Sequence, residues 1–336
     1  MATSFFLKPL NNFQRFFSQK NVSNKGINQP DLRDFLRTSN YQQLDKPAYM
    51  KSPPPMGKKY FQLKNQLKKL NLSTVCQETK CPNIGECWGD NTSTTATIMI
   101  MGDLCTRACR FCSIKTARIP KPLDLDEPLK TALAIKEWSV DYIVITSVDR
   151  DDLPDFGASH FAETIKEIKL HKPTIKLEVL IPDFNGDLDF LAKIVDAKPD
   201  VIAHNIETVK SLQSQVRDRR ASFASSIKIL KNIKIFSPKT VSKTSIMLGL
   251  GESMEEVKSC MSTLVENDVD CLTLGQYIQP TVNNLKVKNY IKESEFKMLK
   301  DYGEKLGFKY VASGPLIRSS YRAGEFFIKN IIESRQ

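Results

Sequence analysis

Residues 96–112 of this 336-residue chain read ATIMIMGDLCTRACRFC, a short β-rich run that leads into three closely spaced cysteines. The cysteines follow the pattern Cys105-x3-Cys109-x2-Cys112. Several soft sulfur donors this close in sequence are typical of metal centres, above all of iron–sulfur clusters. The stretch therefore predicts a strand that is followed directly by a metal-binding loop.

A second set of three cysteines lies upstream, with the spacing Cys76-x4-Cys81-x5-Cys87 in a turn-rich segment. A closed structural zinc or cubane site has four protein ligands, whereas three ligands leave one metal position open. Two sets of three therefore predict two clusters, each with an open position. Disulfide frameworks are typical of small secreted chains, and structural zinc is typical of CxxC or CxxH pairs. A disulfide framework does not fit a chain of this length with 41% hydrophobic residues, and the spacing of the two sets of three favours iron–sulfur clusters over zinc.

Strand-like and helix-like runs alternate along most of the chain. The β-rich runs are 96–101, 141–147, 175–181, 200–205, 243–249 and 270–275. The helical patterns lie at 58–72 and near 129–139, 158–171, 187–197, 208–233 and 253–267. Such alternation predicts βαβ units and a parallel sheet. Six units without an early Gly-rich phosphate loop favour an α/β fold built on a partial (β/α)6 TIM-like barrel over a dinucleotide-binding sheet.

The charge of the chain is concentrated near its N-terminus. The formal net charge is +11, and residues 1–60, with ten Lys or Arg and three Asp, account for +7 of it. Residues 1–30 hold four basic residues, seven interleaved Phe or Leu and no acid, which predicts a mitochondrial transit peptide, with a disordered tail as the alternative. The remaining +4 leaves no basic face for nucleic acid. No run of 18 apolar residues occurs, so we expect no membrane span.

Polar residues follow the predicted strands, where a barrel carries its active site. Asn205 and Glu207 follow the fourth strand, and they either bind a ligand or form a hydrogen-bond network at the rim. Gly249 and Gly251 follow the fifth strand, where they either admit a cofactor or only make the turn. The acidic run after the second strand either caps the next helix or organises Arg150 and a cofactor. Cys260 and Cys271, among apolar neighbours, are expected to be core thiols.

The CxxxCxxC loop after the first strand resembles that of the radical S-adenosylmethionine (radical SAM) superfamily. With the CxxxxCxxxxxC set upstream, the chain is similar to the lipoyl synthase family over about residues 58–330. Six further motifs carry this resemblance: 146–154 (TSVDRDDLP), 181–186 (IPDFNG), 204–209 (HNIETV), 247–252 (MLGLGE), 274–281 (LGQYIQPT) and 314–321 (GPLIRSSY).

The resemblance implies a reaction and two 4Fe-4S clusters. Lipoyl synthases insert two sulfur atoms at carbons 6 and 8 of an octanoyl chain attached to a carrier protein, and they consume S-adenosyl-L-methionine. By the resemblance, Cys105, Cys109 and Cys112 hold the radical cluster, and Asn205, Glu207, Gly249 and Gly251 are candidates to bind S-adenosylmethionine. The other cysteine set holds an auxiliary cluster that donates the sulfur, with a serine, Ser319 or preferably Ser320, as its fourth ligand.

The resemblance also implies an organisation and a setting. We expect a transit peptide at 1–30, an N-terminal extension with the auxiliary cysteines at 31–92, the barrel at 93–290 and a C-terminal helix and motif at 291–336. The partners would be octanoylated lipoyl carrier domains (2-oxoacid dehydrogenase E2 subunits and the glycine cleavage H protein) and a ferredoxin-type electron donor in the mitochondrial matrix. Phe156, where glycine is common, and residues 284–296 depart from the family pattern.

Two other functions remain open from the sequence alone. One is a different radical SAM sulfur-inserting enzyme with two clusters, although no added RNA-binding domain is visible. The other is an iron–sulfur electron carrier without catalytic activity. A carrier needs only a small shell around its cluster, and the many polar residues at the barrel rim argue against it.

Overall fold

The computed structural model describes residues 45–50, 57–69, 73–79, 81–88, 97–138 and 140–320. The predicted transit peptide and Tyr321 lie outside these ranges. The chain divides into units 1–44 and 45–336, and every described residue belongs to the second unit. Within the described part, no helix is long and apolar enough to cross a membrane.

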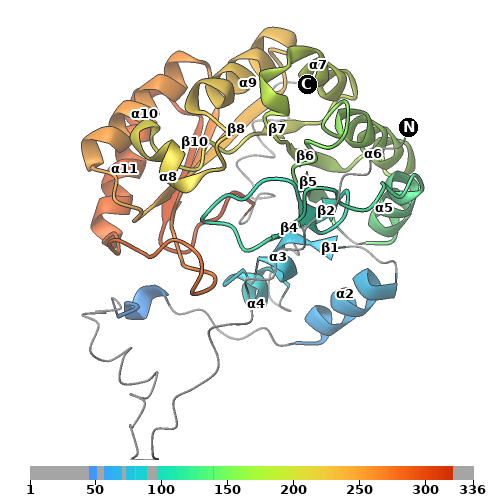
Figure 1. Ribbon diagram of the computed structural model, residues 1–336, viewed down its shortest axis with the longest axis horizontal. Coiled ribbons are helices and arrows are strands. Elements are labelled where there is room, and N and C mark those ends of the chain that lie inside the picture. Colours follow the sequence, from blue (N-terminus) through green and yellow to red (C-terminus); the bar gives the residue numbers. More distant parts are fainter. Residues whose placement is uncertain are drawn as a thin grey trace, which may run out of the picture. The chain divides into compact units, whose positions relative to one another are not determined.

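One eight-stranded sheet, with the order β1-β2-β5-β6-β7-β8-β9-β10, organises this unit (Figure 1). The strands from β2 onward pair in parallel, and β1 pairs antiparallel with β2. Its strands are β1 Ser73–Thr74, β2 Thr97–Ile100, β5 Tyr142–Ser147, β6 Lys176–Leu180, β7 Val201–Ala203, β8 Val241–Leu248, β9 Cys271–Gln276 and β10 Tyr310–Gly314. The six predicted strands are confirmed, and β10 is a seventh parallel strand that the pattern did not reveal.

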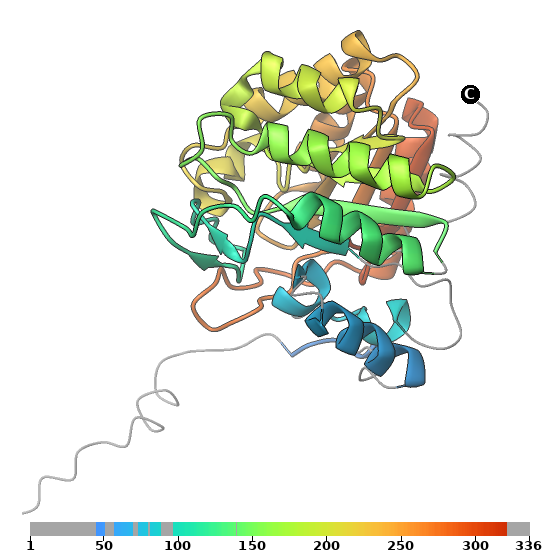
Figure 2. The same ribbon diagram turned by 90° about the vertical axis from the view of Figure 1, so that its right-hand side faces the viewer.

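The helices cover the outer face of this sheet, as a partial barrel requires (Figures 1 and 2). Sequence dictates their positions: in α7, for example, Leu191, Ile194 and Val195 form a buried stripe at helical spacing. Larger helices are α2 Lys58–Lys69, α5 Glu127–Glu137, α6 Ala158–His171, α7 Leu188–Asp196, α9 Phe223–Phe236, α10 Met254–Glu266 and α11 Glu293–Leu306. Short segments are η1 Ala48–Met50, α3 Val75–Glu78, α4 Ile84–Cys87, β3 Leu104–Cys105, β4 Lys115–Thr116, η2 Phe184–Gly186, η3 Lys210–Leu212 and α8 Gln213–Val216.

Alternate strand residues face opposite sides of the sheet. Ile143, Ile145 and Val179 pack in the main core beneath the helices. Tyr142 and Cys271 belong to a separate buried cluster on the inner face, with Val144, Val201 and Val241. Cys260 is buried as well, so both expected core thiols lie in the core.

The helical pattern near 208–233 is confirmed only in part, because the structure breaks it into three segments. The chain forms η3 and α8, leaves the helical path at Arg217 and starts α9 after Ser222. Ser222 caps α9, because its hydroxyl oxygen accepts a hydrogen bond from the Ser225 amide at 3.0 Å. The upstream cysteine segment is also more regular than a loop, because it contains the short helices α3 and α4.

Candidate functional site

A cavity of about 470 Å³ lies at the carboxyl ends of the parallel strands. The loop that carries β3 and β4 and the orange loop after β9 project at this end of the barrel (Figure 2). The cavity is lined by one complete cysteine set and by polar residues that follow several strands. These residues include Cys105, Cys109, Cys112, Thr146, Ser147, Asp149, Asp183, His204, Asn205, Glu207, Arg217, Ser319 and Ser320.

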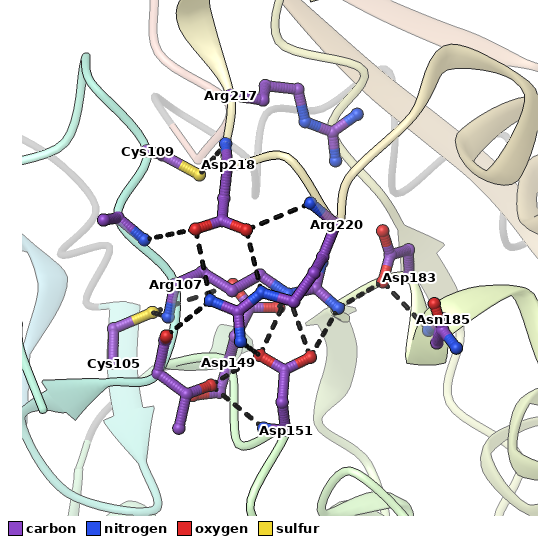
Figure 3. A network of polar contacts seen from close by, with 12 residues as sticks. Cys105, Arg107, Cys109, Asp149, Asp151, Asp183, Asn185, Arg217, Asp218 and Arg220 are labelled. Carbon is purple, nitrogen blue, oxygen red and sulfur yellow. Dashed lines mark hydrogen bonds and ion pairs between the residues drawn. The ribbon is translucent and has the colours of Figure 1, made fainter. Parts of the chain in front are cut away.

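Arg107, a residue of the cysteine loop, forms ion pairs with three aspartates (Figure 3). Its buried guanidinium group lies 3.4 Å from Asp149, 2.9 Å from Asp151 and 2.8 Å from Asp183. Burial raises the pKa of Asp149 to about 6, against the opposing effect of the Arg107 charge. The acidic run does not cap the next helix; instead, Asp152 pairs with Arg150 at 2.8 Å. The Gly157 and Ser159 amides at the start of α6 donate to Asp155.

The three thiols of this loop form a donor set that fits a cubane. All the cysteines of the chain are free, and burial raises the pKa of Cys105 and Cys109 to about 12. Iron must therefore displace protons when it binds these thiols. In the part of the chain that the structure describes, no three Cys, His, Asp or Glu side chains could hold a single metal ion. A cubane cluster does not need three side chains around one ion, because each thiolate binds a different iron atom of the cluster.

Asn205 and Glu207 lie together in the cavity wall. A hydrogen bond joins their side chains, and burial raises the pKa of Glu207. The Glu207 backbone is left-handed, with φ of 67°, and bonds to β8 through Ser245 and Met247. The Asn205 Oδ1 atom is buried without a protein partner among the described residues. A buried acceptor that lacks a partner fits a ligand that donates a hydrogen bond.

Gly249 and Gly251 are not among the residues that line the two cysteine cavities. Both have positive φ, 94° and 114°. A Cβ atom on Gly249 would collide with the Asn289 carbonyl and the Gln276 amide. The structure therefore gives Gly249 a role in the turn after β8 and does not bring either glycine to the other predicted site residues.

A second cavity, of about 370 Å³, adjoins the first. Cys76 and Cys81 line it, whereas Cys87 ends α4 and packs against the main core. The Asn83 side chain donates to the Leu316 carbonyl oxygen at 2.6 Å, which ties this cysteine segment to the chain before Ser319 and Ser320. The two cavities share several lining residues: Cys112, Asn205, Glu207, Ser319 and Ser320.

Sequence reasoning did not place Asp183, which lines the first cavity, or Asp218, which contacts the cysteine loop, among the site residues. Asp183 lies after β6, with its Oδ2 atom buried and unpaired among the described side chains. Asp218 lies in the interruption between α8 and α9, and its amide donates to the Cys109 sulfur at 3.3 Å. The capping serine of α9, Ser222, is the one local signal that could have revealed this interruption.

Comparison with known proteins decides the family. Residues 99–264 match the model of the radical SAM superfamily, and residues 4–81 match the N-terminal domain of lipoyl synthase. The chain is 54% identical to the human protein named "Lipoyl synthase, mitochondrial", over 92% of this chain and 88% of that protein. The bovine protein of the same name is 53% identical, over 98% and 89%. The chain belongs to the lipoyl synthase family. Members of this family are radical SAM sulfurtransferases, so a 4Fe-4S cluster and S-adenosylmethionine are implied.

Solved structures agree on the fold. Streptococcus suis SuiB bound to S-adenosylmethionine has a TM-score of 0.52 and 14% identity, covering 81% of this chain and 60% of its own. The hydrogenase maturase HydG from Carboxydothermus hydrogenoformans has a TM-score of 0.50 and 14% identity, covering 82% and 77%. The partial barrel of this lipoyl synthase family member is thus the fold of these two proteins.

Proposed function

We propose that this member of the lipoyl synthase family inserts two sulfur atoms at carbons 6 and 8 of a protein-bound octanoyl chain. One observation carries the proposal: the cavities of the two cysteine sets share a wall. A reaction that takes a radical from one centre and sulfur from another needs both beside the same carbon atoms. An electron carrier has no such need.

The radical cluster is assigned to Cys105, Cys109 and Cys112, which leave one iron open for S-adenosylmethionine. When bound, the two clusters and S-adenosylmethionine supply a 5′-deoxyadenosyl radical and the sulfur. Asn205 and Glu207 are placed to hold polar groups of S-adenosylmethionine, because they lie in the same wall and Asn205 offers a buried free acceptor.

The auxiliary cluster is assigned to Cys76, Cys81 and Cys87, with Ser320 as its fourth ligand. Ser319 and Ser320 line both cavities, so their position does not separate them, and the family motif favours Ser320. A hydroxyl oxygen is a poor ligand for iron beside thiolates. A ligand that leaves readily would suit a cluster from which sulfur is extracted.

The relatives are named mitochondrial, which supports a location in the mitochondrion and, with the basic residues of 1–30, in its matrix. The protein substrates would be octanoylated lipoyl carrier domains, those of 2-oxoacid dehydrogenase E2 subunits and the glycine cleavage H protein. The electron donor would be a ferredoxin-type protein.

Removal of each cysteine set tests the assignment. With Cys76, Cys81 and Cys87 replaced by alanine, the reconstituted protein should still cleave S-adenosylmethionine in the presence of dithionite but should add no sulfur to an octanoylated carrier peptide. The matched variant without the 105–112 cysteines should do neither. Lipoyl product from the first variant would overturn the assignment of the sulfur source. Absence of cleavage by the intact protein with full iron content would favour an electron carrier.

A further inference from the structure

The segment between α8 and α9, residues 217–222, contacts the cysteine loop 105–112 (Figure 3). The Asp218 carboxylate accepts a hydrogen bond from the Ala108 amide at 2.9 Å, and the Asp218 amide donates to the Cys109 sulfur at 3.3 Å. Two residues earlier, the Val216 carbonyl oxygen accepts from the Arg110 amide at 2.9 Å. Three consecutive residues of the loop are thus bound by one short segment.

Arg220 fixes the orientation of Asp218. Its guanidinium group donates to Asp218 Oδ1 at 2.8 Å and to the Thr106 carbonyl oxygen at 2.7 Å, and it lies 3.1 Å from Asp151. The ion-pair partner of Asp218 therefore also binds the cysteine loop, through the Thr106 carbonyl.

Hydrogen bonds to a ligating sulfur matter for a cluster. An amide that donates to thiolate stabilises the more negative, reduced cluster, because a hydrogen bond strengthens with the charge on its acceptor. Residues that orient metal ligands typically change metal affinity about 10–100-fold when they are replaced. Main-chain amides that donate to sulfurs of this loop include those of Asp218, to Cys109, and Arg107, to Cys105 at 3.4 Å.

We propose that Asp218 is a positioning residue for the radical cluster. Its carboxylate, oriented by Arg220, anchors the Ala108 amide, and this anchor keeps the Asp218 amide on the Cys109 sulfur. The pair thereby sets how firmly the loop retains iron and how easily the cluster accepts an electron. The inference rests on the proposed function, since it requires that Cys109 be a cluster ligand.

The test compares Asp218→Ala with Asp218→Asn in the full chain. Both variants also lack Cys76, Cys81 and Cys87, so that only the radical cluster is present. Both lose the same charge, but asparagine keeps an oxygen acceptor for the Ala108 amide. Asp218→Ala should release iron to a chelator about tenfold faster than the Asp218 parent. Asp218→Asn should stay within about threefold of it, and so should the neighbouring exposed control Arg219→Ala.

The reduction potential, from an EPR-monitored titration, gives the second readout. Asp218→Ala should have a more negative potential than Asp218→Asn, because only the alanine variant loses the side-chain anchor that keeps the residue 218 amide on the Cys109 sulfur. Equal release rates and equal potentials for the two variants would overturn the inference. If the Asp218 parent itself binds no cluster, the proposed cysteine assignment fails instead.

A second pair covers the case in which Asp218→Ala does not fold. Arg220→Lys keeps a cation that can reach Asp218 and the Thr106 carbonyl, whereas Arg220→Leu removes it. We expect faster iron release from Arg220→Leu than from Arg220→Lys. Equal rates of iron release from these two variants would also overturn the proposed role of Asp218.

Discussion

Lys243 and Glu178 form an ion pair inside the barrel, and its disruption should be costly. The Lys243 Nζ atom lies 2.9 Å from both carboxylate oxygens of Glu178, and the two side chains are only 2% and 1% exposed. The Tyr142 hydroxyl donates to the same carboxylate at 2.6 Å. Lys243→Met would leave that hydroxyl as the remaining side-chain donor to Glu178 among the described residues.

The expected loss is about 3–5 kcal/mol in the free energy of unfolding, the usual cost of leaving one charge of a buried pair uncompensated. Replacing Tyr142, Glu178 and Lys243 together by Phe, Met and Met should restore stability to within about 1 kcal/mol of the parent, because apolar groups of similar volume often replace buried ion pairs without loss. Equilibrium urea unfolding of the cluster-free protein measures both values.

The exposed pair Lys297–Asp301 is the matched control, because it has the same 2.9 Å separation on the surface of α11. Lys297→Met should produce no measurable change. If Lys243→Met were as stable as the triple replacement, or no worse than Lys297→Met, burial would not govern the energetics of the inner pair.

Three further predictions follow from the site. Burial lowers the pKa of His204 to about 4, so between about pH 6.5 and pH 4 the unfolded chain binds more protons than the folded chain. The free energy of unfolding should therefore fall by up to about 3 kcal/mol as the pH drops through this range. In urea titrations His204→Gln should flatten the dependence of stability on pH, and the same dependence in both proteins would show that His204 does not cause it. Gly249→Ala should destabilise the turn by about 1–3 kcal/mol, because its φ is positive and its Cβ meets the Asn289 carbonyl; an unchanged urea midpoint would refute this. Asn205→Ala should weaken S-adenosylmethionine binding about tenfold, the loss of one buried hydrogen bond, measured by equilibrium binding to the reconstituted protein; unaltered affinity would remove Asn205 from the ligand site.

The fold could be predicted where each element carries its own pattern. The apolar run of β5 and the buried stripe of α7 signal their elements locally. β10, with the sequence YVASG, carries no such signal, and it becomes a strand because it pairs with β9. The break at Arg217 was missed because the residues on both sides of it fit a helical pattern. In the structure the broken segment contacts the distant cysteine loop.

The site could be predicted where residue type and spacing alone indicate a metal ligand or a polar residue at the end of a strand. Cysteine spacing showed the two sets, and the position after β7 singled out Asn205 and Glu207. The role of Asp218 depends on a contact with Cys109 across 109 residues of chain, which no local pattern encodes. For Gly249 the sequence predicted a turn, but it did not predict that the Asn289 carbonyl and the Gln276 amide would lie against this glycine.

The most direct test of the account is a single turnover with labelled clusters. The full chain, reconstituted anaerobically with isotopically heavy sulfide, would be mixed with S-adenosylmethionine, dithionite and an octanoylated carrier peptide, and the peptide would be read by mass spectrometry. If the auxiliary cluster donates the sulfur, the lipoyl product should carry two heavy sulfur atoms and 5′-deoxyadenosine should form with it. Formation of 5′-deoxyadenosine without heavy sulfur in the peptide would contradict the account.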